Sequence, residues 1–250
     1  MLTLYHAPIS TCSQKVRLCL AEKRLEFESC IIDFGNQDHL ADSYLSLNPN
    51  GVVPTLVHEG TPVIDSSVIC EYLDDVWPES SLTPDTALGR AEMRAWMRYA
   101  EEVPTTAIRI PSFNKLFAKV LGNMPEPAFN AMTERMPLRK AFYREMEGVQ
   151  GFSEQRYSES LEKLDKTLER LDSALAHKEW VCGDRLTIAD IVFVPILVRM
   201  EDLGLQHMWS NRLQVARWFA AIQKRESFAR AYFEGSRVNA DAFNLQINLD

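Results

Sequence analysis

Residues 10–13, Ser-Thr-Cys-Ser, place two hydroxyls and a thiol where a helix is expected to begin. The run follows Pro8 and opens a stretch with helical spacing of apolar residues. Backbone N–H groups and the helix dipole at such a terminus stabilise an anion, including a thiolate, and a serine hydroxyl can donate to it. A structural interpretation also fits, because Thr11 and Gln14 stand at capping-box spacing, which contributes about 1 kcal/mol and no function.

Two further pairs combine a backbone feature with polar chemistry. In Val53-Pro54 a proline follows a β-branched residue where a strand begins, which fits a strand start or a cis peptide and offers the Val53 N–H and C=O to an extended peptide. An ordinary turn is the alternative. In Asp65-Ser66, at a helix start, the carboxylate can take an ammonium group while the hydroxyl and a backbone N–H take a carboxylate. Helix capping alone is again the alternative.

Cysteine usage predicts neither a disulfide framework nor a metal site. The five cysteines are unevenly spaced and form no Cys-x-x-Cys or Cys/His cluster. Cys19 and Cys70 lie in apolar stretches and are expected in the core. Cys12 is therefore the one cysteine with a candidate chemical role.

The elements that must position these groups alternate over the first third of the chain. Short apolar runs predict strands, and apolar residues at helical spacing predict helices. The expected order is βαβαββα, with strands at 2–5, 27–33, 55–58 and 61–64, and helices at 11–23, 38–46 and 66–76.

Beyond residues 77–84, which hold two prolines and two serines, strand-like alternation almost disappears. Helical patterns occupy 93–97, 161–175, 191–203 and 215–223, and the leucine series within 161–175 predicts a core helix. Residues 111–152 are rich in Phe, Met and Pro and predict either an adaptable apolar wall or an irregular core segment.

Composition indicates a soluble globular protein. The 250 residues are 46% hydrophobic and 25% charged, with a formal net charge of -8. The acidic balance argues against nucleic-acid binding, and no apolar run approaches the roughly 20 residues of a membrane helix. The N-terminus has no basic region followed by an apolar stretch, so a cytoplasmic location is expected.

Together, the 10–13 run, Val53-Pro54, Asp65-Ser66 and the helical second half resemble a cytosolic glutathione transferase. The run 183–190 resembles the capping box and hydrophobic staple of that family's C-terminal domain. Thr187 and Asp190 have capping-box spacing, and Leu186 and Ile191 can form the staple. Residues 68–80, residues 90–94 and the long segment before Phe152 are most similar to the bacterial lignin β-etherase branch.

The resemblance implies a thioredoxin-like α/β domain at 1–78, a linker at 79–86 and an all-helical domain at 87–250 that forms the co-substrate site. It implies glutathione as co-substrate, a hydrophobic small-molecule electrophile as partner, and no metal. It also implies a homodimer, with the face around Met93 and Met97 meeting the partner's first domain. Burial of these methionines in the subunit core is the alternative.

By the same resemblance, particular residues receive roles. Val53, with Pro54, would pair with the cysteinyl part of glutathione, and Asp65 with Ser66 would hold the γ-glutamyl group. Val52 stands where Gln or Lys is usual, so the glycyl carboxylate would need another partner. The candidates for that carboxylate are Gln37 and His39, and those for the hydrophobic site are Ile9, Ile108, Phe113 and Phe117.

The thiol-activating group has three candidates. His6 stands where Tyr-using classes place their tyrosine, so the serine or cysteine classes fit better. Ser13 is the preferred residue, Ser10 is implied by the zeta-type motif, and Cys12 remains open. The expected reaction is attack of the glutathione thiolate on a hydrophobic electrophile, which includes aryl-ether cleavage. The alternatives are thiol transfer or deglutathionylation through Cys12, a zeta-like isomerase, and a non-catalytic glutathione-binding protein.

Overall fold

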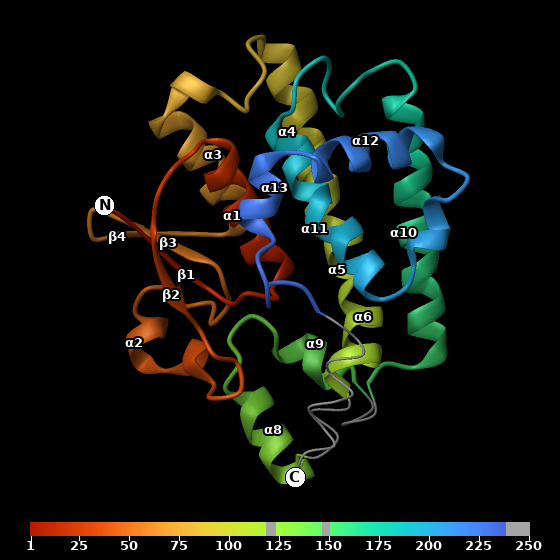
Figure 1. The fold of residues 1–250 in the computed structure, drawn as a ribbon. Coiled ribbons are helices and arrows are strands. Elements are labelled where there is room, and N and C mark those ends of the chain that lie inside the picture. The colour runs from red at the N-terminus through yellow and green to blue at the C-terminus, as the bar shows by residue number, and fades with distance from the viewer. Residues whose placement is uncertain (119–123, 147–150, 239–250) are drawn as a thin grey trace.

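A sheet with its helices lies beside a group of longer helices in the computed structural model (Figure 1). The structure describes residues 1–118, 124–146 and 151–238. The sheet order is β2-β1-β3-β4, in which β1 and β2 are parallel and the other neighbours antiparallel. The strands are β1 (Leu2–His6), β2 (Glu28–Ile31), β3 (Thr55–His58) and β4 (Thr61–Ile64).

Helices cover both faces of this sheet because the side chains of β1 alternate. Leu2 and Leu4 point into the core shared with α1 (Thr11–Glu22) and α3 (Ser66–Val76). Tyr5 points to the other face, where its ring centroid lies 6.1 Å from that of Tyr44 in α2 (Asp42–Leu45). The predicted βαβαββα order and the thioredoxin-like α/β class are confirmed.

The element boundaries differ slightly from the sequence prediction. The second strand is shorter than 27–33, and the helix expected at 38–46 is split into the 3₁₀ turn η1 (Asp38–Leu40) and α2. The split occurs at Ala41, whose extended backbone (φ -71°, ψ 142°) ends one turn and begins the next.

The second part is helical, as predicted. Its elements after the turn η2 (Pro78–Ser80) are α4 (Ala87–Glu102), α5 (Pro104–Ala107), α6 (Arg109–Ser112), the π-helical turn η3 (Phe113–Phe117), α8 (Glu126–Glu134), α9 (Lys140–Arg144), α10 (Glu154–Leu175), α11 (Ile188–Asp202), η5 (Gln206–Trp209), α12 (Leu213–Gln223) and α13 (Glu226–Ala231).

Helix α11 forms the centre of the molecule. Apart from Asp190 and Arg199 it is apolar from Ile188 to Met200, where every residue is buried, and it packs against α1, α4 and α12. The predicted capping box at its start is present: the Thr187 N–H donates to Asp190 Oδ2 at 2.8 Å. Both staple residues, Leu186 and Ile191, are buried in the same core.

Several predicted core residues are confirmed. The leucines of α10 from Leu164 to Leu175 are buried, and so are Cys19 and Cys70. Met93 and Met97 are also buried inside the subunit, which supports the core alternative and not a partner-facing surface.

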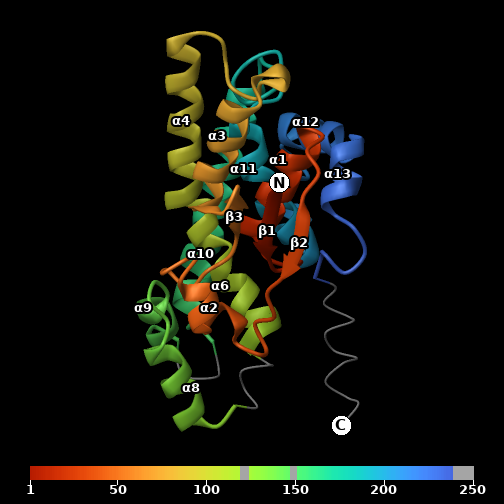
Figure 2. The same ribbon diagram turned by 90° about the vertical axis from the view of Figure 1, so that its left-hand side faces the viewer.

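The Phe- and Met-rich segment forms its own cluster against the sheet part. Phe129, Met132 and Met136 pack with Leu40 of η1 in a second buried cluster. Helices α8 and α9 accordingly lie at the same end of the molecule as α2 in both views (Figures 1 and 2). Residues 119–123 and 147–150 of this segment lie outside the described residues.

The stretch between the two parts is held by a buried ion pair. Lys23 Nζ lies 2.7 Å from Asp74 Oδ1, and the same oxygen accepts from the Leu82 N–H at 2.7 Å. The Leu82 carbonyl in turn accepts from the Ile188 N–H at 3.0 Å. Burial alone would raise the pKa of Asp74, but the bonds from Lys23 and Leu82 hold it below its ordinary value. Among the described helices, none is long and apolar enough to cross a membrane.

Candidate active site

The register of the sheet brings the three stretches predicted to bind the ligand to one edge of the sheet, the one formed by the end of β1, the start of β3 and the end of β4. Thr55, the first residue of β3, pairs with Tyr5 of β1 and with Ile64 of β4. The next residues outward from this row are therefore His6, Pro54 and Asp65. The loop before α1, the Val53-Pro54 step and the start of α3 all leave the sheet at this edge.

Ser10, and not Thr11, caps the first helix. The Ser10 backbone is extended, and its Oγ accepts from the Ser13 N–H at 3.3 Å. Gln14 points away from the cap and donates to the Ser236 carbonyl at 2.8 Å. The expected Thr11–Gln14 capping box is therefore wrong, because Gln14 is used to hold a distant part of the chain.

The three thiol-activating candidates differ in exposure. Ser13 is 0% exposed, and its Oγ accepts a long bond of 3.4 Å from the Ala7 N–H. Ser10 and Cys12 are half-buried and lie at the open end of the helix. Cys12 also lies within electrostatic range of Lys15, whose pKa it helps to raise.

The Val53-Pro54 peptide bond is cis. Tyr44 Oη and Asn48 Nδ2 both donate to the carbonyl of Val52, at 2.7 and 2.8 Å, and so fix the chain just before it. Within the described part of the chain, the N–H and C=O of Val53 have no hydrogen-bond partner. Buried backbone groups are normally paired, so this pair is available to an incoming peptide.

Asp65 caps α3 from a left-handed backbone conformation. Its φ is 72°, and its Oδ1 accepts from the N–H groups of Ser67 and Val68 at 2.9 and 3.1 Å. A non-glycine residue with positive φ is strained, and such strain gathers at functional sites. The second carboxylate oxygen remains available to a ligand cation.

A buried cation lies beneath Ser66, which the sequence prediction did not include. Lys15 Nζ donates to Ser66 Oγ at 3.0 Å and to Ser67 Oγ at 3.2 Å, and it forms an ion pair with Glu101 of α4. Burial alone would lower the pKa of Lys15, but Glu101 and Cys12 raise it above its ordinary value. The Ser66 hydroxyl, with Lys15 behind it, is thus suited to an anionic group.

Sequence reasoning could have found Lys15 but not Glu101. Lys15 lies one turn inside the first helix, beside the apolar residues Val16 and Leu18, which is a recognisable signal for a paired buried charge. Glu101 is separated from it by 86 residues, and nothing in the local sequence connects the two.

His6 is directed away from this edge. Its Nε2 lies 2.8 Å from Ser29 Oγ, and its Nδ1 lies 3.2 Å from Arg17 Nη1. Burial and the Arg17 charge lower the pKa of His6 to about 4. The neutral ring therefore accepts from Arg17 and is committed to the interior.

The candidates for the glycyl end lie around η1. Gln37 Oε1 accepts from Arg135 Nη1 at 3.2 Å, and Arg135 Nη2 donates to the Leu40 carbonyl at 3.2 Å. His39 is buried against Phe34, and its Nδ1 has no partner among the described residues. Arg135, from the helical part, was not anticipated.

The four residues expected at the hydrophobic site are not equivalent. Ile9 is half-buried in the loop before α1, whereas Ile108 is 1% exposed and belongs to the main core. Phe113 is half-buried, with its ring centroid 5.1 Å from that of Phe117 and 4.9 Å from that of Phe142. The aromatic wall is thus built by η3 and α9 together.

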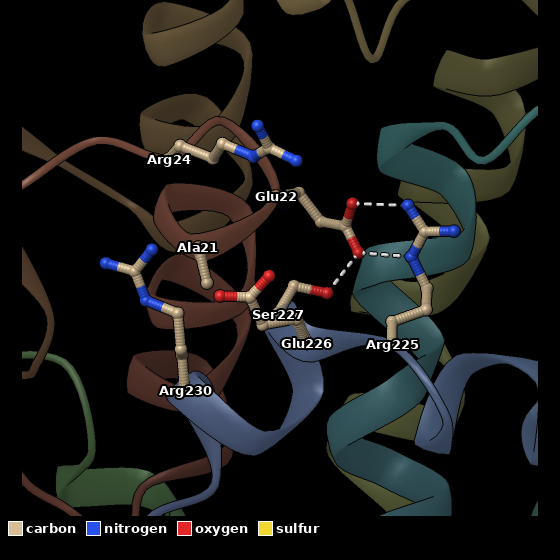
Figure 3. A pocket seen from close by; sticks show the side chains of 7 residues that line it. All are labelled: Ala21, Glu22, Arg24, Arg225, Glu226, Ser227 and Arg230. Atoms are coloured by element: carbon tan, nitrogen blue, oxygen red, sulfur yellow. Dashed lines mark hydrogen bonds and ion pairs between the residues drawn. The ribbon is translucent and has the colours of Figure 1, made fainter.

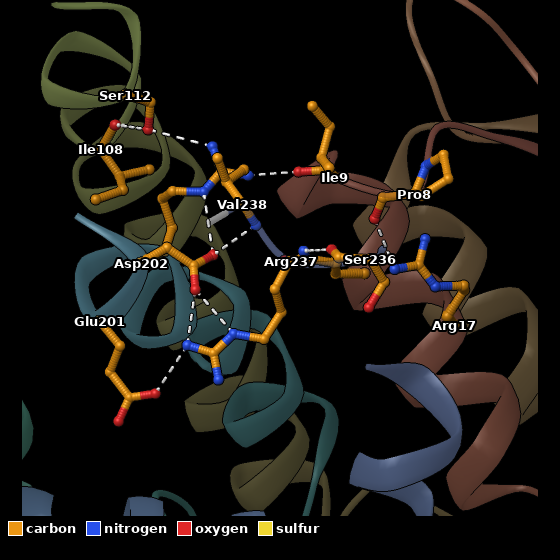
Figure 4. Close-up of polar contacts among 12 residues, drawn as sticks. Pro8, Ile9, Arg17, Ile108, Ser112, Glu201, Asp202, Ser236, Arg237 and Val238 are labelled. Atoms are coloured by element: carbon orange, nitrogen blue, oxygen red, sulfur yellow. Dashed lines mark hydrogen bonds and ion pairs between the residues drawn. The ribbon is translucent and has the colours of Figure 1, made fainter. Parts of the chain in front are cut away.

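Two buried arginines hold the loop that precedes α1. Arg17 Nη2 donates to the Pro8 carbonyl at 2.8 Å (Figure 4), and Arg199 Nη2 donates to the Ile9 carbonyl. Arg199 Nη1 also donates to Ser112 Oγ at 3.3 Å, so one guanidinium joins the loop to the end of α6.

The C-terminal segment of the described chain supports Arg199 from behind. Asp202 lies 3.8 Å from Arg199 Nε and accepts from Arg237 Nε at 2.8 Å (Figure 4). The Val238 N–H donates to the same carboxylate at 3.3 Å. The chain between Ser236 and Val238 therefore fixes both Gln14 of α1 and the end of α11.

A hollow of about 550 Å³ lies elsewhere, between the end of α1 and α13 (Figure 3). Its Glu22 accepts from Arg225 Nε at 2.6 Å and Nη2 at 2.7 Å, and Arg230 pairs with Glu26. None of the predicted site residues lines it, and its charges largely satisfy one another. Within the described residues, no group of three or more His, Cys, Asp or Glu could hold a metal ion.

Comparison with known proteins identifies the family. Residues 9–76 match the model of the glutathione S-transferase N-terminal domain, and residues 128–226 match that of the C-terminal domain. The chain is 30% identical over 193 residues to Protein LigF from Sphingobium sp. (strain NBRC 103272 / SYK-6), covering 76% of this chain and 75% of that protein. The chain therefore belongs to the glutathione S-transferase family of enzymes, for which glutathione is the co-substrate.

Individual relatives support this conclusion. Glutathione S-transferase TCHQD from Arabidopsis thaliana is 28% identical, covering 95% of this chain and 92% of that protein. The crystal structure of beta-etherase LigF from Sphingobium sp. strain SYK-6 superposes with a TM-score of 0.83 at 27% identity, covering 92% of this chain and 98% of that one. A glutathione S-transferase from Rhodospirillum rubrum F11 gives a TM-score of 0.71 at 28% identity, with 94% and 93% covered. The likeness to the β-etherase branch is thus confirmed.

Proposed function

We propose that this protein activates the thiol of glutathione for attack on a hydrophobic electrophile. The observation that carries the proposal is that the segments with Ser10, Val53 and Asp65 all adjoin the sheet where Tyr5, Thr55 and Ile64 are paired. The cysteinyl backbone would pair with the free N–H and C=O of Val53, next to Pro54. The γ-glutamyl ammonium would bind Asp65, and its carboxylate would bind Ser66 above Lys15.

In this proposal Ser10 activates the thiol. Its Oγ already accepts from the Ser13 N–H, so its own hydrogen is free to be donated to a sulfur at the helix start. Ser13, the residue preferred on sequence grounds, is less suitable because its side chain has no exposed surface. The glycyl carboxylate would bind Arg135 beside Gln37, with His39 forming the wall behind.

The required stabilisation is within reach of these groups. A free thiol has a pKa of about 8.5, and lowering it by about two units takes roughly 2.7 kcal/mol. A charge-assisted hydrogen bond supplies about 1.5 to 3 kcal/mol, and a helix terminus about 0.3 to 1. One hydroxyl at the start of α1 therefore suffices.

The test compares two serines in the site with one outside it. Calorimetry should detect reduced glutathione binding to the wild type, and Ser10→Ala should raise the pKa of the bound thiol and lower kcat about tenfold or more, with little change in affinity. Ser13→Ala should have the smaller effect. Ser153→Ala is the matched control, because Ser153 caps α10 through the N–H of Arg156. No heat of binding to the wild type would contradict the proposal, and an unchanged pH profile in Ser10→Ala would exclude Ser10.

The finer proposal is cleavage of an aryl ether, supported by the similarity to beta-etherase LigF. The sulfur would bond to the carbon beside a carbonyl, the carbon–oxygen bond would break, and the aryloxide would leave with the electron pair. Incubation with glutathione and a β-aryl ether ketone should release a phenol and a glutathione thioether. Turnover of simple aryl halides without phenol release would restrict the reaction to the coarser class.

The competing function is thiol transfer through Cys12, favoured by its partial exposure near Lys15. The Cys12 thiolate would attack glutathione disulfide, the S–S bond would break, and one glutathione thiolate would leave. Mass spectrometry after treatment with glutathione disulfide should reveal this adduct, and Cys12→Ser should abolish it. Activity of Cys12→Ser equal to the wild type would exclude the route.

We further propose the homodimer and the division into a domain at 1–78, a linker at 79–86 and a helical domain at 87–250. Val68 of α3 is 51% exposed and Leu88 of α4 is 82% exposed, which is unusual for large apolar residues and suits a partner surface. Sedimentation should give twice the subunit mass, and Leu88→Glu should shift it toward one. A wild type that sediments as a single subunit would contradict the dimer.

A further inference from the structure

Two arginines from neighbouring elements lie at one end of the aromatic wall. Arg109 begins α6, and Arg139 immediately precedes α9. Each lies four residues before an aromatic residue, Phe113 and Tyr143, whose ring centroids are 5.5 Å apart. Residues four apart share a helix face, and the Tyr143 N–H donates to the Arg139 carbonyl at 3.1 Å. The two side chains are therefore carried to the same end of the cluster.

Neither guanidinium forms an ion pair with an acidic residue in the parts of the chain that the structure describes. Within residues 1–118, 124–146 and 151–238, Arg109 and Arg139 make no hydrogen bond and no ion pair, although both are half-buried. The other basic residues nearby are satisfied: Arg135 by Gln37 and Leu40, and Arg144 by Glu134 at 2.5 Å. Burial, followed by the charge of Arg109, lowers the pKa of Arg139.

Such a pair is costly without an anion. Two like charges held close together in a partly buried place repel each other and lose hydration. Glu101 is within electrostatic range of both arginines but is already bound by Lys15 and Ser67. The unmet demand for negative charge is therefore at the guanidinium groups themselves.

The position of the pair relative to the expected thiol follows from two further contacts. Arg139 is within electrostatic range of Cys12 at the start of α1. Pro137, two residues before Arg139, lies against Gly51, where an added Cβ would come within 3.0 Å of its Cδ. The segment thus passes close to the loop that leads into Val53.

We propose that Arg109 and Arg139 form an anion-binding subsite for the electrophile, so that the preferred co-substrate is an aromatic electrophile carrying a carboxylate or a phenolate. The proposal rests on the function proposed above. The aromatic cluster of Phe113 and Tyr143 would pack against the ring, and the paired guanidinium groups would bind the oxygens, a geometry suited to bidentate contacts.

The same carboxylate chemistry has a second source, the glycyl end of glutathione. We favour the electrophile as the ligand of Arg109 and Arg139, because Arg135 already lies at η1, where the glycyl carboxylate is expected. Arg135 donates to Gln37 and to the Leu40 carbonyl there.

The experiment uses a chloronitrobenzoate and its neutral methyl ester. In both, the sulfur bonds to the ring carbon that bears chlorine, the carbon–chlorine bond breaks, and chloride leaves. Because the ester is intrinsically the more reactive of the two, each kcat/KM is divided by the rate constant of the uncatalysed reaction with glutathione. The ratio of this corrected kcat/KM for the benzoate to that for the ester should exceed one in the wild type and decrease with salt. Arg109→Gln and Arg139→Gln should each lower this ratio about ten- to a hundredfold, the value of one charge-assisted contact. Arg144→Gln is the control that should leave the ratio unchanged, because Arg144 lies at the end of α9 and is paired with Glu134.

Parallel calorimetry separates the possible failures. If Arg139→Gln weakens the binding of glutathione but not of its glycyl ester, the arginine serves the glycyl carboxylate and the inference is overturned. A wild-type ratio at or below one overturns it without any variant, which covers the case in which a variant does not fold. If the wild type binds no glutathione at all, the proposed function fails instead. Equal ratios in the wild type and both variants, with glutathione binding intact, would refute the subsite alone.

Discussion

At the scale of single residues, His6 illustrates how burial decides what a titratable group can do. It lies at the end of β1, next to the candidate site, yet its ring is bound by Ser29 and Arg17 in the interior. Because its pKa is lowered to about 4, it is neutral at physiological pH and contributes to stability and not to thiol activation.

The pH dependence of stability should report this burial. Between pH 6.5, the ordinary pKa of a histidine side chain, and about pH 4, the unfolded chain binds a proton at His6 and the folded chain does not. The free energy of unfolding should therefore fall as pH drops through this interval, by up to about 3 kcal/mol from this group. Urea unfolding across the interval should give a smaller loss for His6→Gln, which keeps an acceptor for Arg17 and a donor for Ser29. Equal losses in the two proteins would contradict the assignment.

At the scale of elements, Asp190 links the start of α11 to two other segments. Its Oδ2 accepts from the N–H of Thr187, while its Oδ1 accepts from the Val181 N–H and from Trp218 Nε1, each at 2.9 Å. One carboxylate thus caps α11 and also binds the preceding loop and α12 to it.

Substitution of this carboxylate should be strongly destabilising. Asp190→Asn turns an amide N–H toward the donors that Asp190 now satisfies, so we expect a loss of about 2 to 4 kcal/mol in the free energy of unfolding. Asp184→Asn, at an exposed position in the same loop, should change it by less than about 0.5 kcal/mol. Thermal and urea unfolding of both variants would measure the difference, and a loss equal to that of Asp184→Asn would contradict the role.

The elements themselves were largely predictable, because local patterns specify them. The predicted bounds of β3 and β4 agree with the structure at every residue, and the helical spacing of apolar residues predicts α3 and most of α10. The failures occurred where a distant contact outweighed a local one. Gln14 looked like a capping residue, but a carbonyl 222 residues away accepts its hydrogen bond.

At the scale of the whole molecule, the candidate site depends on contacts between its two parts. The loop that carries Ser10 is held at Ile9 by Arg199, which also binds Ser112. Residues far apart in sequence therefore set the separation between the loop that carries Ser10 and the end of α6, next to the aromatic wall. The sequence could suggest Val53, Asp65 and Ser66 from local chemistry, but Lys15–Glu101 and Arg199–Ile9 depend on packing that no local pattern records.

Arg199→Lys should test this coupling. Lysine retains the charge but cannot reach Ile9 and Ser112 at once, and small displacements of reacting groups cost up to about a hundredfold in rate. We expect kcat to fall at least about tenfold while the affinity for glutathione stays within about twofold. Arg217→Lys is the control, because it removes similar contacts, to the carbonyls of Leu175 at the end of α10 and of Lys178 just after it. Equal kinetics in the two variants would reduce Arg199 to a general stabilising role.

At Asp65, the residue that best suits the positive φ of the backbone is not the residue that best suits ligand binding. Glycine adopts that conformation freely and is an acceptable helix cap, so Asp65→Gly should leave the melting temperature unchanged or slightly higher. The same change deletes the carboxylate that we propose binds the γ-glutamyl ammonium, and glutathione affinity should fall about tenfold or more. Laboratory selection for thermal stability alone should therefore favour glycine at position 65, whereas selection for turnover should favour aspartate. Thermal unfolding and calorimetric titration of Asp65→Gly with glutathione would measure the two effects.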